Sequence, residues 1–243
     1  MRYGPHPEQV ADLWLPEPPS PDNGPTAEGY PVVVSIHGGY FQKHYRRDLH
    51  DPLSRRLVGS GLAVLNVEYR RAHTGGSLEA TTDDVMTAIS WLGSRPGQWR
   101  PGVSVVGHSA GGYLALWSAS HPAVDLAIGL AAASDLADCV NGGYDSGSVA
   151  DWLGALPGDD PARYARADLF RRLPTGATTW LVHGDGDDTV PLHQSSRYVE
   201  QAQQSGDVSV LSVLRGEGHF AVIDPLSPAF ESWHKRLVER LAP

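Results

Sequence analysis

The sequence predicts an α/β fold in which a mostly parallel central sheet is covered by helices on both faces. Stretches rich in Val, Ile and Leu alternate along the chain with stretches whose apolar residues recur at helical spacing. The run "VVVSI" at residues 32–36 is unbroken and β-branched, as expected of a strand buried on both faces. At residues 104–117, "SVVGHSAGGYLALW" passes from a β-rich segment through small residues directly into a helical one. Strands that alternate with helices predict a parallel sheet.

The elements follow in order from these patterns. The first strand, "QVADLWL", alternates like an edge strand, and a surface loop rich in Pro and Gly spans residues 15–31. The other expected strands lie at residues 32–36, 62–69, 103–107, 124–132, 178–184 and 208–214. The expected helices lie at residues 49–61, 77–93, 109–120, 193–206 and 228–241.

Length and composition predict a single domain over residues 1–243. Residues 134–174 interrupt the alternation with short helical pieces and turn signals, so we expect them to form a small lid over one end of the sheet. Hydrophobic residues make up 41% of the chain and charged residues 19%, which is ordinary for a globular enzyme. The net charge of −9 disfavours nucleic acid as a partner, because the field of the protein repels phosphates.

Targeting signals and metal-binding patterns are not recognised in the sequence. The N-terminal stretch lacks the apolar core of a signal peptide and no apolar run could span a bilayer, so we expect a cytoplasmic protein that does not contact membranes. With one cysteine, Cys139, an internal disulfide or a thiolate cluster is impossible. Asp185, Asp187 and Asp188 lack the ligand spacing of a calcium loop. We therefore expect no metal and no cofactor.

Ser109 stands in the pentapeptide "GHSAG", which matches G-x-S-x-G. In that motif a strained turn between a strand and a helix exposes the serine hydroxyl, and the flanking glycines let the backbone pack closely. A serine that only caps the helix is the alternative. The position after a strand favours chemistry, because ligands of such sheets bind beyond the carboxyl ends of the strands.

The partners that a nucleophilic serine needs follow it in the chain. The stretch "LVHGDGDDTVP" places Asp187 and Asp188 just after a strand, where either could orient a histidine. The stretch "GEGHF" places His219 after the last strand, as a candidate base. Upstream, "SIHGGYF" leaves a strand through two glycines and offers backbone N–H groups to an oxyanion. The expected oxyanion donors are the N–H groups of Gly39, Tyr40 and Ala110.

Together these motifs resemble the α/β-hydrolase superfamily, and within it the small esterase and kynurenine-formamidase-like group. The resemblance rests on "HGG" followed by two aromatics, "NVEYRR", "GHSAGG", "HGDGDDTVP" and "GHF", in the order of that family and over nearly the whole chain. It implies that Ser109 is the nucleophile, Asp187 the acid and His219 the base. The chain departs from formamidase-type relatives at Phe41, where they usually carry Trp, and we expect the first strand of the fuller superfamily sheet to be missing or rudimentary.

Other polar and aromatic residues are weaker candidates. Tyr40, Phe41, Tyr113 and Trp152 could form walls of the acyl pocket, although aromatics in such a sheet are more often core. His193 could also line the pocket, although a surface position at a helix start suits it as well. We expect three further histidines to be structural: His37 bracing the oxyanion loop, His108 filling space behind the serine turn, and His183.

The predicted function is hydrolysis of small esters or activated amides, N-formyl aryl amides among them, through an acyl-enzyme on Ser109. One alternative is an acyltransferase, lyase or cyclising enzyme that reuses the same triad. A peptidase and a non-catalytic ligand receptor are further alternatives; loss of the histidine would indicate the receptor, and His219 is present. The expected partner is a small-molecule ester or amide, and the sequence leaves monomer and homodimer open.

Overall fold

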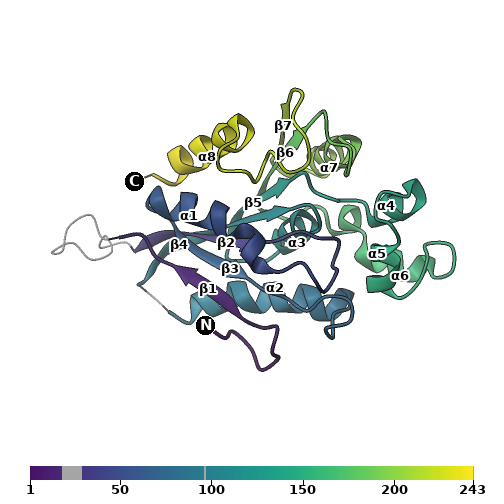
Figure 1. The fold of residues 1–243 in the computed structure, drawn as a ribbon, viewed down its shortest axis with the longest axis horizontal. Helices are drawn as coiled ribbons and strands as arrows, with labels where there is room; N and C mark the ends of the chain where they lie inside the picture. The colour runs from purple at the N-terminus through teal and green to yellow at the C-terminus, as the bar shows by residue number, and fades with distance from the viewer. Residues whose placement is uncertain (18–28, 96, 243) are drawn as a thin grey trace.

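A seven-stranded sheet forms the centre of the molecule and confirms the predicted fold class (Figure 1). The computed structural model describes residues 1–17, 29–95 and 97–242. The strands follow the order β1-β3-β2-β4-β5-β6-β7, and β1 alone among them runs antiparallel to its neighbour. Their bounds are β1 Ala11–Trp14, β2 Tyr30–Ile36, β3 Ala63–Val67, β4 Trp99–His108, β5 Val124–Leu130, β6 Thr178–Gly184 and β7 Ser209–Leu214.

Helices cover both faces of this sheet, as the unbroken apolar strands require. The longer helices are α1 Asp51–Gly59, α2 Leu78–Gly93, α3 Ala110–Ser118, α7 His193–Gln204 and α8 Pro228–Leu241. One core cluster joins buried residues of α1 and α8 to one face of the sheet, and a larger cluster joins α2, α3 and α7 to the other. Figure 1 shows α1 and α8 on one side of the sheet and α2 on the opposite side.

Local sequence signals set the ends of these helices. Ser77 caps α2, since its Oγ accepts the N–H of Ala80 at 3.1 Å. Pro52 and Pro228 lie at the first turns of α1 and α8, where a missing N–H costs nothing.

Among the described residues, no helix has both the length and the apolar character needed to cross a bilayer.

At the β1 edge, the described residues form a remnant of a further strand. Arg2 and Val10 form an isolated antiparallel bridge beside β1, in keeping with the expected rudimentary first strand. The predicted surface loop at 15–31 falls mostly on residues 18–28, which lie outside the described residues.

The connection between β5 and β6 carries three short helices, α4 Leu136–Gly142, α5 Ser148–Leu153 and α6 Pro161–Ala167. The 3-10 turn η2, Leu169–Arg172, follows them and leads towards β6. These short helices lie together at one end of the molecule (Figure 1). They occupy the segment 134–174 in which the sequence predicts a lid.

Candidate active site

Ser109 occupies a tight turn between β4 and α3. Its backbone has a positive φ of 56° with ψ −119°, a conformation that non-glycine residues rarely adopt. The glycines around it are needed for packing. A Cβ on Gly107 would lie 1.9 Å from the carbonyl oxygen of Gly111, and a Cβ on Gly111 would lie 2.2 Å from the carbonyl oxygen of Ile36. The turn therefore holds the serine at the carboxyl end of β4 between closely packed backbones.

Asp187 and His219 meet beyond the ends of β6 and β7. His219 Nδ1 lies 2.7 Å from Asp187 Oδ2, and both side chains are buried. The other carboxylate oxygen of Asp187 accepts the N–H groups of Thr189 and Val190 at 2.9 and 2.8 Å. With Nδ1–H donated to the carboxylate, His219 presents Nε2 as a proton acceptor. Asp188 is exposed, and its carboxylate accepts only the hydroxyl of Thr189, at 3.3 Å, among the described residues.

The charge on Asp187 is stabilised by its hydrogen bonds. Burial by itself would raise the pKa of this carboxyl, but hydrogen bonds from His183 and His219 and from the Val190 N–H hold the pKa well below its usual range. His183 Nε2 lies 3.3 Å from Asp187 Oδ2, and its Nδ1 lies 2.7 Å from Ser195 Oγ. Asp187 is therefore an ionised acceptor for the imidazole of His219 at neutral pH.

The loop after β2 approaches Ser109 closely. A Cβ on Gly38 would lie 3.1 Å from the Cβ of Ser109. Within the described residues, the N–H groups of Gly39, Tyr40 and Ala110 donate no hydrogen bond. Unpaired N–H groups near a serine hydroxyl are suited to receive a developing negative charge.

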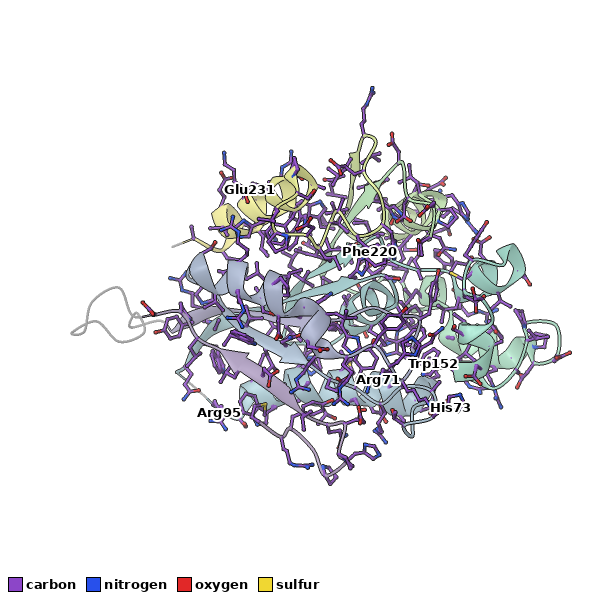
Figure 2. The ribbon with its side chains drawn as sticks, in the orientation of Figure 1. Arg71, His73, Arg95, Trp152, Phe220 and Glu231 are labelled. Carbon is purple, nitrogen blue, oxygen red and sulfur yellow. The ribbon has the colours of Figure 1, made fainter. Side chains whose placement is uncertain are left out.

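A buried ionic cluster holds this loop in place. His37 stacks on Tyr69 with ring centroids 4.4 Å apart, and its Nε2 lies 3.0 Å from Glu68 Oε1. Glu68 also binds Arg71, whose guanidinium donates to the carbonyl oxygen of Tyr45 at 2.7 Å. Arg71, which Figure 2 labels, is 1% exposed. The cluster ties the loop after β2 to the end of β3.

One cavity of about 320 Å³ contains most of these groups. Its lining includes Gly39, Tyr40, Ser109 and His219, whereas Ala110 is fully buried beneath it. The remaining lining residues are Gly38, Gln42, Tyr45, Leu49, His50, His108, Tyr144, Asp145, Ser146, Thr189, Phe220 and Ile223. The structure thus brings Ser109, His219 and two of the three expected oxyanion donors to one space, with Asp187 behind His219.

Four residues expected in the pocket wall lie elsewhere. Phe41, Tyr113 and Trp152 are buried core residues and do not line the cavity. Phe41 stacks on Trp152 of α5 at 3.8 Å between ring centroids, so each ring covers a face of the other. Figure 2 labels Trp152. His193, also outside the cavity lining, instead pairs with Asp138 at 2.6 Å on the partly exposed start of α7.

Two further histidines line the cavity. His108 Nε2 lies 2.9 Å from the carbonyl oxygen of His219, and His50 Nδ1 lies 2.9 Å from Ser35 Oγ. Burial, with the neighbouring His37, lowers the pKa of His50 to about 3, and burial lowers the pKa of His108 well below its usual value. Both imidazoles are therefore neutral at neutral pH.

Sequence reasoning missed most of the cavity wall. Phe220 follows the histidine of "GHF" directly, so its place beside the site was available from the motif; Figure 2 labels it. Tyr144 and Asp145 stand in the segment 134–174, which carries no motif or periodicity that would mark them.

Comparisons with known proteins agree with this architecture. Over 100 residues the chain is 35% identical to the gibberellin receptor GID1 of Oryza sativa subsp. japonica, covering 38% of this chain and 28% of the receptor. It is 24% identical to a probable isoprenylcysteine alpha-carbonyl methylesterase of the same organism, over 92% of this chain and 57% of that protein. The chain thus spans less than two thirds of the length of either curated relative.

Solved structures share the fold. A truncated carbohydrate esterase from gut microbiota superposes with a TM-score of 0.83 at 16% identity, covering 100% of this chain and 95% of that one. The fold is therefore the α/β-hydrolase fold of esterases. The BD-FAE family model matches residues 20–201, about three quarters of the sequence. On this match, the chain belongs to the BD-FAE family of α/β-hydrolases.

Proposed function

We propose that this protein is a serine hydrolase that cleaves small carboxylic esters through an acyl-enzyme on Ser109. The observation that carries the proposal is the 2.7 Å pair of His219 and Asp187 at the cavity into which the strained serine turn opens. A nucleophile, a base with an oriented tautomer and free N–H donors are the parts that acyl transfer requires.

The first half-reaction acylates the serine. Ser109 Oγ bonds to the substrate carbonyl carbon while its proton passes to His219 Nε2, and Asp187 stabilises the imidazolium that forms. The N–H groups of Gly39, Tyr40 and Ala110 stabilise the oxyanion. The carbon–oxygen bond to the alcohol then breaks, and the alcohol leaves with the proton from His219.

The second half-reaction releases the acid. Water attacks the acyl carbon and gives a proton to His219, and the bond between Ser109 Oγ and that carbon breaks as the proton returns to Oγ. The products are the carboxylic acid and the free enzyme. The N–H donors again stabilise the oxyanion of this step.

The cavity suits a substrate with a short acyl group. A space of about 320 Å³ is at the lower end of small-molecule sites, and it must hold both the acyl group and the leaving group. The apolar side chains of Leu49, Phe220 and Ile223 favour burial of an apolar acyl or alcohol group. The segment 134–174, which supplies Tyr144 and Asp145 to the wall, serves in this proposal as the lid.

A serine-reactive phosphonate tests the assignment. We expect intact-mass and peptide analysis to place one adduct on Ser109, and Ser109→Ala to abolish the adduct and lower kcat by roughly 10⁶ while the circular dichroism spectrum stays unchanged. A fully active Ser109→Ala protein would falsify the nucleophile assignment.

Substrate panels then separate the alternatives. Acetyl and butyryl aryl esters should have a higher kcat/KM than decanoyl esters, because methylenes beyond the cavity gain no burial, worth about 0.8 kcal/mol where they fit. N-formylkynurenine turned over as fast as the best ester would favour a formamidase. If the phosphonate labels Ser109 but esters and the formamide are inert, acyl transfer or cyclisation becomes the better description. Absence of labelling would instead favour a receptor.

A further inference from the structure

Asp145 is a buried carboxylate without an ion-pair partner in the cavity wall. The residue is 2% exposed, and its Oδ2 accepts the N–H of Val149 at 2.8 Å. Its other oxygen accepts no hydrogen bond, and no Lys, Arg or His lies within ion-pair distance among the described residues. Accepting the Val149 N–H in the first turn of α5 uses only one oxygen, and an amide oxygen would accept the same N–H. The described residues therefore offer this carboxylate no cationic side-chain partner.

Aromatic rings surround the same space. Tyr40, Tyr45, Tyr144 and Phe220 all line the cavity with Asp145. Aromatic faces attract organic cations through the ring quadrupole, most strongly where water is excluded. A carboxylate that lines the same cavity as several aromatic rings is thus suited to an ammonium group, whose charge it balances and whose alkyl groups the rings can cover.

No Lys or Arg side chain in the described cavity lining is available to pair with the Asp145 carboxylate. Two of the three histidines in that lining, His50 and His108, are neutral at neutral pH. Arg71, which holds the Tyr45 carbonyl, is already paired with Glu68 and Glu8. The net charge of −9 adds an attractive field for cations. A carboxylate-bearing substrate would be repelled by Asp145 and by this negative field.

We propose that the preferred esters carry an organic ammonium group, which Asp145 and the aromatic wall bind during the reaction at Ser109. This inference rests on the proposed esterase function and names its substrate class. Asp145 acts here as a specificity-determining residue and takes no part in bond making. The ammonium can belong to the alcohol or to the acyl part of the ester, and both place the same chemistry in the cavity.

The test compares cationic esters with neutral isosteres of the same shape. Butyrylcholine against 3,3-dimethylbutyl butyrate places the charge on the alcohol. Methyl 4-(trimethylammonio)butanoate against methyl 5,5-dimethylhexanoate places it on the acyl group. We expect the cationic ester to have at least a tenfold higher kcat/KM in one of the two pairs, and that pair identifies the side of the ester that carries the ammonium. Equal or faster turnover of the neutral ester in both pairs would overturn the proposal.

Substitutions test whether the preference for cationic esters depends on the negative charge of Asp145. Asp145→Asn keeps the size of the side chain and an acceptor for the Val149 N–H, so we expect it to fold and to lower the cationic preference at least fivefold. Asp83→Asn removes the same charge from an exposed position on α2 outside the cavity, and should leave the preference unchanged. A preference that survives Asp145→Asn refutes the role of Asp145. Tyr144→Leu is a second variant, expected to lower the preference by removing one ring.

Binding of a cation that is not a substrate tests the ammonium site independently of the proposed esterase function. Calorimetric titration with tetramethylammonium should show binding to the wild-type protein and at least fivefold weaker binding to Asp145→Asn. If Ser109 hydrolyses neutral esters and shows no preference for cationic ones, the ammonium site is refuted and the proposed function stands. If esters are inert and the phosphonate does not label Ser109, the proposed function is refuted. The titration then tests the cation site alone, and it refutes that site if tetramethylammonium does not bind or binds the wild-type protein and Asp145→Asn equally.

Discussion

At the scale of single residues, Asp187 combines two tasks that its neighbour Asp188 does not share. One oxygen holds the turn through the Thr189 and Val190 N–H groups, and the other meets His219 at 2.7 Å. Asp188, one residue on, is exposed to solvent. Sequence pattern alone allowed either aspartate to face the histidine, and the difference arises from the direction of one turn after β6.

Substituting each aspartate separates these positions. Asp187→Asn should lower kcat for the best ester by roughly 10⁴, because an amide stabilises the wrong tautomer of His219 and cannot balance the imidazolium. Asp188→Asn should change kcat less than about threefold, as its carboxylate is outside the cavity. The measurement is steady-state kinetics on both variants at one pH. A larger loss for Asp188→Asn would reassign the acid.

At the scale of elements, the serine turn depends on how closely α3 approaches β2. Gly111→Ala should destabilise the protein by more than about 2 kcal/mol, since its Cβ would lie 2.2 Å from the Ile36 carbonyl oxygen and backbone would have to shift. Gly93→Ala, at the end of α2 with open space around it, should be neutral or stabilising by up to about 1 kcal/mol. Urea unfolding of both variants checks the contrast, which similar midpoints would contradict.

The buried ionic cluster that holds the loop after β2 gives a second contrast at this scale. Arg71→Met should cost about 3–5 kcal/mol and lower kcat, because it leaves the buried Glu68 carboxylate short of its partner and frees the Tyr45 carbonyl. Arg56→Met breaks the exposed pair with Glu231, which Figure 2 labels, and should lower the free energy of unfolding by less than about 1 kcal/mol. Unfolding midpoints and kcat for both variants decide, and a stable, fully active Arg71→Met protein would exclude the bracing role.

At the scale of the whole molecule, buried neutral histidines make stability fall in acid. The pKa of His50 in the folded protein is lowered to about 3, chiefly by burial, so between about pH 6.5 and pH 3 the unfolded chain binds a proton that the folded protein does not. The contribution is fully present above pH 6.5 and is lost at about 1.4 kcal/mol per pH unit below it. His108, whose pKa is also lowered, adds in the same direction.

Urea unfolding at pH 7.5, 6.0 and 5.0 measures this slope. His50→Gln can still form a hydrogen bond with Ser35. This variant should reduce the slope of the unfolding free energy against pH by the amount that one bound proton contributes. His121, which is partly exposed and whose pKa is lowered by partial burial, offers a comparison: His121→Gln should flatten the slope less. An identical slope in His50→Gln and the wild-type protein would contradict the assignment.

The fold class and the main strands and helices could be predicted from the sequence because their signals are local. Helical periodicity and unbroken β-branched runs predicted α8 at its observed bounds and β6 likewise. The meeting of Asp187 and His219 followed from strands that end at one edge of the sheet, and their catalytic roles stay predictions. Most of the cavity wall could not be predicted. Phe41 and Trp152 look like pocket residues in isolation, but they cover each other, and only three-dimensional packing reveals that pairing.

Under the two proposals, the reacting groups and part of the binding site lie on different stretches of this chain. Ser109, Asp187 and His219 follow β4, β6 and β7, whereas Tyr144 and Asp145 come from the insertion between β5 and β6. Under these proposals, mutations of Tyr144 and Asp145 change which molecule is accepted while the reaction stays constant, so substrate range can drift between lineages. The same division invites grafting: an insertion from a relative, joined at the ends of β5 and β6, should transfer its preference to this scaffold.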